Sequence, residues 1–264
     1  MRTRKAFTLI ELLVVIAVIA VLMAVLMPAL NRVKKQARSV ACMARLRSWG
    51  LMFKFYTDDY DGSFNPGWNE GEETLWMNAL RPYYKDEWKM LLCPTATRID
   101  ESNQEGTFMA MTRDIATPGG GRYEYKFSYG INSWTNHMTQ NRGARMKEWF
   151  WKTTEVKGQN NIPVFADSTW HDAWPTDTDT PIQLPWGFGG GDQGTVDEMN
   201  QFCIDRHNGW TNSLFMDWSA RHVGLKELWT LKWHRKFETA GQYTSAGGMQ
   251  ASAWPPWLRG HKDY

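Results

Sequence analysis

A long apolar segment near the N-terminus constrains this chain more than any other feature. Residues 7–27 read FTLIELLVVIAVIAVLMAVLM, and the basic hexapeptide MRTRKA precedes them. About 20 apolar residues are enough to cross the hydrocarbon core of a bilayer as a helix. Glu11 lies inside the segment, and burying its carboxylate in hydrocarbon is costly unless the carboxylate finds a partner. The sequence therefore predicts a transmembrane helix whose acid pairs with a second group.

Two other interpretations of this segment explain less of it. A secretory signal peptide has an apolar region of roughly 7–15 residues, followed by a small-x-small cleavage site, with no acid inside. Here the apolar run is longer, and Pro-Ala-Leu-Asn-Arg-Val-Lys-Lys follows it. An ordinary single-span anchor would be long enough, but it leaves the acid at position 11 without a role.

The residues around the acid resemble the N-terminal signal of type IV pilins and type II secretion pseudopilins. The stretch FTLIELLVV matches the family pattern, and Ala6 stands where the family usually has Gly. The resemblance implies that a prepilin peptidase removes residues 1–6 as a leader peptide and methylates the new amine of Phe7. It also implies roles in assembly for Glu11, the fifth mature residue, and for Pro28, which falls where pilins often carry a helix-loosening proline.

The helix is predicted to continue beyond the membrane and to support a globular head. No Pro interrupts residues 31–56, and Gly50 is the first Gly there. Side chains that recur at steps of four and three residues share one face of a helix, and these are Cys42, Leu46, Trp49, Phe53 and Tyr56. We therefore expect one helix over residues 7–57, with residues 7–27 in the membrane, and a head over residues 58–264.

The head is predicted to be α+β, with a small antiparallel sheet packed against the long helix. Alternating or apolar runs indicate strands at residues 123–129, 161–167, 211–216 and 220–223, the last two joined by a tight turn. Short helices are expected at residues 75–84 and 86–92, an amphipathic helix at 226–237, and a long loop between Thr95 and Arg122. The Gly-rich segment 187–194 has no following Lys-Ser/Thr pair and is interpreted as a surface loop.

A second block, residues 206–237, resembles the H-X9-DG domain at the C-terminus of many prepilin-like proteins. His207 is followed by nine residues and then Asp217, and Trp218 stands where the pattern has Gly. We favour the interpretation that His207 and Asp217 hydrogen-bond backbone groups and so fix strand ends and the hairpin turn. The alternative is a polar-network or calcium site, because major pseudopilins that this chain resembles bind calcium in a C-terminal loop. Its first candidate ligands are Asp167, Asp205 and Asp217, and no other cofactor is expected.

Charge and motif content argue against two function classes. The formal net charge is +2, and removal of Arg2, Arg4 and Lys5 with the leader takes it to −1. Bulk electrostatics therefore does not favour nucleic acid as a partner. The sequence contains no HExxH, GxSxG or CxxC motif, and its six histidines are scattered. We expect neither a nucleic-acid-binding protein nor an enzyme.

The three cysteines are expected to lie outside the cytoplasm, where disulfides persist. Cys42 belongs to the predicted helix face, and Cys93 lies in an apolar Leu-Leu-Cys-Pro segment that should pack against it. A Cys42–Cys93 bridge is the favoured prediction, and two buried free thiols are the alternative. Cys203 is then the odd cysteine.

Together these features predict a filament subunit of the inner membrane, with its head on the periplasmic side. The resemblance implies polymerisation into a type II secretion pseudopilus or a type IV pilus-like fibre. It also implies three kinds of partner: a prepilin peptidase, copies of the chain itself or related pseudopilins, and an inner-membrane assembly platform. A carbohydrate-binding or adhesive subunit is the alternative, because sixteen tryptophans are far above average usage and exposed rings stack on sugars. The rings considered for that role are Trp170, Trp174, Trp186, Trp254 and Trp257.

Overall fold

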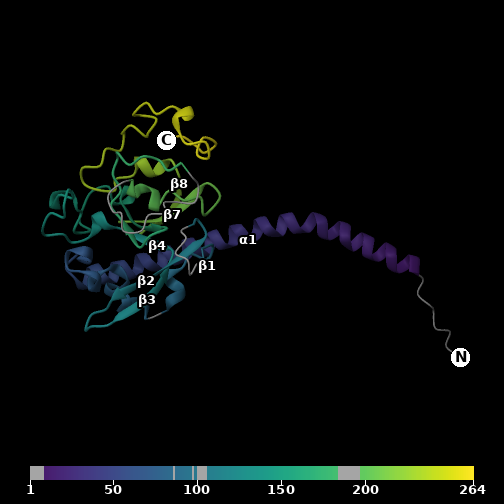
Figure 1. The fold of residues 1–264 in the computed structure, drawn as a ribbon, viewed down its shortest axis with the longest axis horizontal. Coiled ribbons are helices and arrows are strands. Elements are labelled where there is room, and N and C mark those ends of the chain that lie inside the picture. Colours follow the sequence, from purple (N-terminus) through teal and green to yellow (C-terminus); the bar gives the residue numbers. More distant parts are fainter. Residues whose placement is uncertain (1–8, 86, 97, 100–105, 184–196) are drawn as a thin grey trace.

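The computed structural model describes residues 9–85, 87–96, 98–99, 106–183 and 197–264. These residues form one long helix and an α+β head, as the sequence predicts. Helix α1 (Leu9–Asp59) has 51 residues, which corresponds to about 75 Å at 1.5 Å per residue. Figure 1 shows its second half crossing the head and its first half projecting away from the head. By length and composition, α1 can cross a membrane.

The two halves of α1 have different surroundings. Residues 9–38 are all exposed. The second half buries the predicted helix face, namely Cys42, Leu46, Trp49, Phe53 and Tyr56. Pro28 lies inside α1 and does not end it. The head therefore covers one apolar face of the second half, whereas the apolar side chains of the first half are uncovered.

The described part of the head contains two sheets. The smaller sheet contains β1 (Arg98–Ile99), β2 (Met109–Ala116) and β3 (Arg122–Phe127) in that order, with β2 and β3 antiparallel. The larger sheet has the order β6-β4-β5-β7-β8, and its strands are β4 (Tyr129–Asn132), β5 (Pro163–Asp167), β6 (Asp172–Ala173), β7 (Trp210–Phe215) and β8 (Ala220–Gly224). Neighbours in the larger sheet are antiparallel except β4 and β6. Strands β7 and β8 form the predicted hairpin.

An aromatic cluster holds α1 against the head. The Trp49 ring lies 5.4 Å from Trp76, 5.5 Å from Tyr84 and 5.2 Å from Phe165, measured between ring centroids. Trp76 belongs to the single-turn helix α2 (Trp76–Ala79), and Tyr84 to α3 (Arg81–Tyr84). Tilted and edge-to-face pairs of this kind contribute about 0.5–1.5 kcal/mol each beyond the area they bury. In the structure, the single-turn helices α2 and α3 take the place of the predicted helix over residues 75–84. A 3-10 turn over Trp88–Leu91 takes the place of the predicted helix over residues 86–92.

The predicted loop between Thr95 and Arg122 is wrong, because β1 and β2 lie within it. Strand β2 buries Ala110, Met111 and Ile115, which do not alternate along the strand. Antiparallel pairing with β3 over six residues stabilises β2 instead. Pairing with a partner strand therefore determines this element more than its own pattern does.

The predicted helix over residues 226–237 is also wrong. All of these residues are described, and their regular structure is a 3-10 turn over Glu227–Thr230. A helix would need the Trp233 carbonyl for its own hydrogen bonds, but that carbonyl accepts from Asn132 Nδ2 and Trp151 Nε1, both at 2.9 Å. Tertiary contacts thus override the local helical pattern.

Candidate functional site

The N-terminal site falls partly outside the described residues. Ala6 and Phe7, the predicted cleavage and methylation positions, are among the residues that the structure does not describe. Glu11 lies in the first turn of α1, and Pro28 lies about five turns further along. The large apolar side chains between them are exposed. This half of α1 therefore presents apolar groups around its whole circumference.

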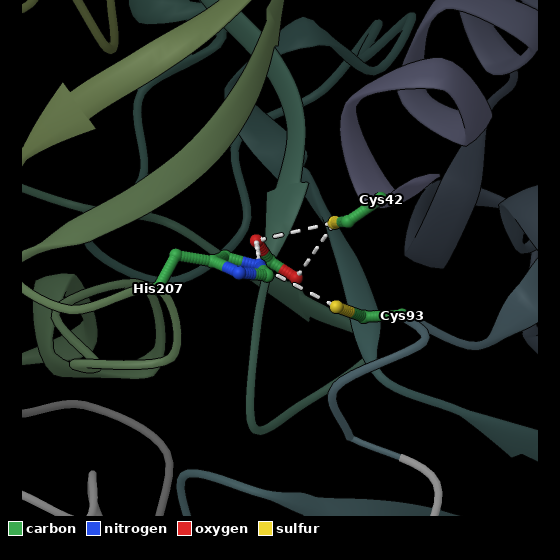
Figure 2. Close-up of side chains that lie close together, drawn as sticks. Cys42, Cys93 and His207 are labelled. Carbon is green, nitrogen blue, oxygen red and sulfur yellow. Dashed lines mark hydrogen bonds and ion pairs between the residues drawn. The ribbon is translucent and has the colours of Figure 1, made fainter. Parts of the chain in front are cut away.

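A buried polar cluster joins the second half of α1 to the head. It comprises Cys42 on α1, Cys93 after the Trp88–Leu91 turn, Asp167 at the end of β5, and Arg206 and His207 before β7. All five residues are buried. Figure 2 shows both sulfur atoms and the imidazole pointing toward one carboxylate. Segments that are far apart in the sequence thus meet in one enclosed volume.

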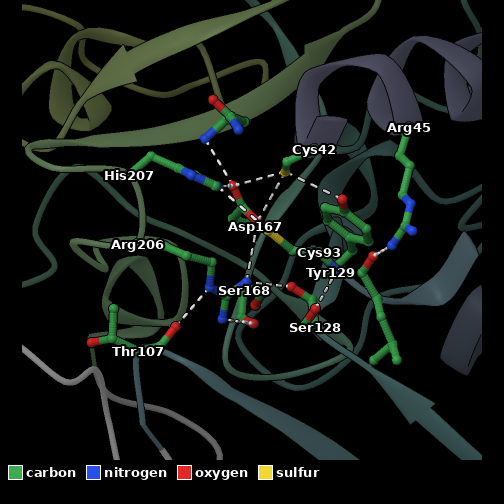
Figure 3. A network of polar contacts seen from close by, with 12 residues as sticks. Cys42, Arg45, Cys93, Thr107, Ser128, Tyr129, Asp167, Ser168, Arg206 and His207 are labelled. Atoms are coloured by element: carbon green, nitrogen blue, oxygen red, sulfur yellow. Dashed lines mark hydrogen bonds and ion pairs between the residues drawn. The ribbon is translucent and has the colours of Figure 1, made fainter. Parts of the chain in front are cut away.

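Asp167 is the centre of this polar cluster (Figure 3). Its carboxylate accepts hydrogen bonds from Arg206 Nη1 at 3.1 Å and from the Asn212 backbone N–H at 3.0 Å, and it lies 3.0 Å from His207 Nε2. Burial alone would raise the pKa of this carboxyl, but the adjacent His207 and Arg206 hold it well below its usual range. Asp167 is therefore ionised, and its partners offset the cost of burying the charge.

Arg206 closes the cluster on the side away from α1. Besides contacting Asp167, its guanidinium donates to three backbone carbonyls, those of Thr107 at 2.7 Å, Ser128 at 2.6 Å and Ser168 at 3.0 Å. The side chain is completely buried. A buried guanidinium with this many acceptors rigidly ties together the strand ends around it.

The two thiols have different neighbours and different acidities. Cys93 Sγ lies 3.5 Å from His207 Nε2, whereas Cys42 Sγ lies 3.2 Å from the Tyr129 hydroxyl and 3.5 Å from Asp167 Oδ1. Burial raises the pKa of the Cys42 thiol, and Cys93 and Asp167 raise it further. For Cys93, contacts with Cys42 and His207 outweigh burial and lower the pKa to about 6. Burial alone would lower the pKa of His207, but Asp167 raises it to about 10.

Both cysteines are free thiols in the structure, and the Cys42–Cys93 disulfide stays a prediction. Their sulfur atoms belong to a group of four donor atoms that all lie within 4.8 Å of one another. Cys203 is a third buried thiol, and its sulfur lies 3.9 Å from the Leu225 carbonyl. The fold thus brings the two predicted partners together and keeps the third thiol apart from them.

His207 and Asp217, the pair of the H-X9-DG pattern, lie in different places. Asp217 is in the exposed turn between β7 and β8, where Oδ1 accepts from the Ser219 backbone N–H at 3.0 Å and hydroxyl at 2.6 Å. Trp218, at the position of the pattern's Gly, has φ +65°, the left-handed conformation that Gly adopts most readily. Asp217 therefore fixes the hairpin turn, whereas the His207 ring contacts Asp167 and Cys93.

The three acids considered as calcium ligands do not meet at one site. Asp167 accepts a hydrogen bond from Asn212 near the start of β7. Asp217 follows the other end of β7, and at 3.3 Å per residue it lies about 16 Å from Asn212 along the strand. Asp205 accepts a hydrogen bond from the Gly209 backbone within the loop before β7. Of the three acids, Asp167 alone belongs to the buried polar cluster.

Arginine side chains cover part of the tryptophan surface considered for sugar binding. Trp174 and Trp254 are buried, Trp170 and Trp257 are half-buried, and Trp186 lies outside the described residues. Indole rings and guanidinium groups alternate in a ladder with spacings of 4.0–5.7 Å, in the order Trp170, Arg113, Trp68, Arg142, Trp174 and Arg145. Cation–π contacts with the chain's own arginines therefore occupy faces of these rings.

The sequence does not identify Arg206 as a member of the buried polar cluster, nor Tyr129 and Asn212 as residues that contact it. The one available signal is the Arg206-His207 pair directly before a strand, since two cationic side chains at the edge of a core need an acid nearby. Tyr129 and Asn212 carry no such signal, because each fits within a predicted strand and the strand pattern gives no further role to either.

Comparison with known proteins gives information about the N-terminus. Residues 1–27 match the family model of the prokaryotic N-terminal methylation motif. No curated protein and no solved structure matches the chain. The matched motif and the membrane-capable helix α1 define a chain with a prepilin-type N-terminus and support a type IV pilin-like protein.

Proposed function

We propose that this chain is a structural subunit of a type II secretion pseudopilus or a type IV pilus-like filament. A prepilin peptidase removes residues 1–6 and methylates Phe7, and the first half of α1 then packs against neighbouring subunits. The observation that carries the proposal is the prepilin-type motif at residues 1–27, continued by a helix whose first half is apolar and exposed. In this proposal the subunit has no catalytic activity of its own.

The exposed apolar surface of α1 requires a partner. Leu9 and Val25, for example, are 79% and 73% exposed, and a continuous apolar surface of this extent marks an interaction site. The bilayer covers this surface before assembly, and helices of neighbouring subunits cover it afterwards. Lipid tails and helix interfaces accept the same apolar side chains. One sequence therefore serves both insertion and polymerisation.

The proposal places the head outside the cytoplasm. The prepilin resemblance puts the cleaved leader on the cytoplasmic face of the inner membrane, and α1 offers a single span. The head then lies on the opposite face, where an assembly platform adds subunits to the growing filament.

Glu11 has a specific role in this assembly. Its carboxylate pairs with the methylated amine of Phe7 on a neighbouring subunit. In an apolar surrounding such a pair is much stronger than in water, and each group would be costly to bury alone. The pair therefore sets the axial register between adjacent helices.

The test combines processing and assembly in native membranes. Mass spectrometry should show an N-terminal, N-methylated Phe7, and Glu11→Ala should be inserted and cleaved but should form no filaments. Asp58→Ala is a matched control, because it removes a carboxylate that pairs with Lys54 on the exposed surface of the same helix. An intact leader, or normal filaments from Glu11→Ala, would contradict the proposal.

A further inference from the structure

The buried polar cluster offers four donor atoms in the arrangement of a metal site. The donor atoms of Cys42, Cys93, Asp167 and His207 lie within 4.8 Å of one another. Around a tetrahedral Zn²⁺, bonds of about 2.3 Å to sulfur and about 2.0 Å to nitrogen or oxygen put sulfur about 3.5 Å from each nitrogen or oxygen ligand. In the structure, Cys93 Sγ lies 3.5 Å from His207 Nε2, and Cys42 Sγ lies 3.6 Å from Asp167 Oδ2. The remaining nitrogen–oxygen separation, 3.0 Å, is slightly shorter than the tetrahedral edge.

We propose that Cys42, Cys93, Asp167 and His207 bind one Zn²⁺ ion that joins α1 to the head. Thiolate, imidazole and carboxylate are the ligand types that zinc uses, and four protein ligands close its coordination sphere. All four residues are buried, so the site is structural. Calcium needs six to eight oxygen ligands, whereas this cluster contains a single carboxylate.

The charges of the cluster balance when zinc is bound. The ion and Arg206 supply three positive charges, and two thiolates and Asp167 supply three negative ones. Burying a net charge is costly, and the zinc-bound cluster avoids that cost. The metal binds thiolates and a neutral imidazole, so the protons on the thiols and on His207 Nε2 leave to solvent when the metal binds.

The groups around the four ligands hold them in position. Arg206 donates to Asp167 Oδ1 at 3.1 Å, the Asn212 N–H donates to Oδ2 at 3.0 Å, and the Tyr129 hydroxyl lies 3.2 Å from Cys42 Sγ (Figure 3). Outer partners of this kind orient the ligands of metal sites. The ion would link α1 to β5 and to two loops of the head. Its binding energy would therefore stabilise the packing of α1 against the head.

Two other states of the same residues make different chemical predictions. A Cys42–Cys93 disulfide leaves neither sulfur free as a thiolate ligand. Free thiols beside the Asp167 ion pairs leave both sulfurs reactive and the protein without metal. Metal content and thiol state together distinguish all three, and neither measurement depends on filament assembly.

The test uses the full-length protein, purified in detergent without chelator or added metal. Elemental analysis by mass spectrometry should find about one zinc per chain. Removing zinc with a chelator should lower the unfolding temperature, and Co²⁺ added to the zinc-free protein should produce a thiolate-to-cobalt charge-transfer band. Wild-type protein that lacks zinc and fails to bind Co²⁺ overturns the proposal, whether its cysteines are then free or bridged.

Variants identify the ligands. Cys93→Ser and His207→Gln should each lower zinc affinity by more than about 10-fold, since the loss of even an outer partner has an effect of that size. Cys203→Ser is the matched control, because Cys203 is a buried free thiol outside the cluster, and it should bind zinc as the wild type does. A folded Cys93→Ser protein with unchanged zinc affinity contradicts the assignment.

Discussion

The two halves of α1 belong to one continuous helix, but they use apolar side chains differently. Residues 9–27 are almost entirely apolar and exposed on every side. In the second half one stripe of apolar residues is buried by the head, whereas apolar side chains off the stripe, such as Leu51, are exposed. A helix that is apolar all round belongs in a membrane or a large core, whereas a stripe belongs at the surface of a domain. The pattern of apolar residues therefore indicates that the first half of α1 packs against a partner outside the chain, whereas the second half packs against the head.

The largest effect should come from deleting the first half of α1. A chain that starts at Lys34 keeps every buried residue of α1, since these begin at Cys42. It should be soluble without detergent and monomeric by size-exclusion chromatography, with an unfolding temperature close to that of the full-length protein. A fall of more than about 4 °C, which corresponds to roughly 1–2 kcal/mol in a domain of this size, would mean that the exposed half also stabilises the head.

Trp49→Ala should destabilise the head by about 3–5 kcal/mol, the usual cost of removing a buried aromatic ring. The variant loses the contacts with Trp76, Tyr84 and Phe165 and the hydrogen bond from Trp49 Nε1 to the Met90 carbonyl. Processing and membrane insertion should be unchanged, because the first half of α1 is intact. Chemical denaturation of the detergent-solubilised protein measures the loss.

Leu51→Ala is the control for that measurement. Leu51 lies two residues from Trp49 on the same helix, and it is 58% exposed. Its truncation should change stability by less than about 0.5 kcal/mol. Equal losses from Trp49→Ala and Leu51→Ala would contradict the assignment of one buried face to this half of α1.

The sequence predicts elements that local periodicity specifies. The stripe from Cys42 to Tyr56 and the β7–β8 hairpin follow from residue spacing and turn residues, and both are confirmed. Strand β2 and the irregular chain after Glu227–Thr230 depend on partners that are distant in the sequence, namely β3 and the Asn132 side chain. Periodicity carries no information about such partners, and for this reason both predictions are wrong.

The polar cluster could be predicted only in parts. The sequence singles out Cys42, Cys93, Asp167 and His207, but it indicates three separate roles for them. Their convergence requires the register between β5 and β7, which places the end of β5 beside Asn212. Arg206 was not identified, because a fully buried arginine is rare and composition gives no sign of it.

The smallest expected effect tests how closely α1 approaches the larger sheet. A Cβ added at Gly50 would lie 2.9 Å from Leu214 Cδ1 and 3.2 Å from the Trp218 carbonyl oxygen. The Leu214 methyl can move, but the carbonyl belongs to the backbone of the hairpin turn. Overpacking costs typically 1–3 kcal/mol, whereas Ala is better than Gly in a helix by about 1 kcal/mol. Gly50→Ala should therefore be net destabilising by about 1 kcal/mol.

Ala44→Gly calibrates the propensity part of that balance, because Ala44 is an exposed position in the same half of α1. It should cost about 1 kcal/mol from helix propensity alone, and the sum of this loss and the loss measured for Gly50→Ala gives the steric cost at Gly50. A Gly50→Ala protein that is more stable than the wild type by the full propensity gain would show that α1 can move away from β7 at no cost. The second half of α1 would then be loosely attached, and its contrast with the first half would rest on side-chain burial alone.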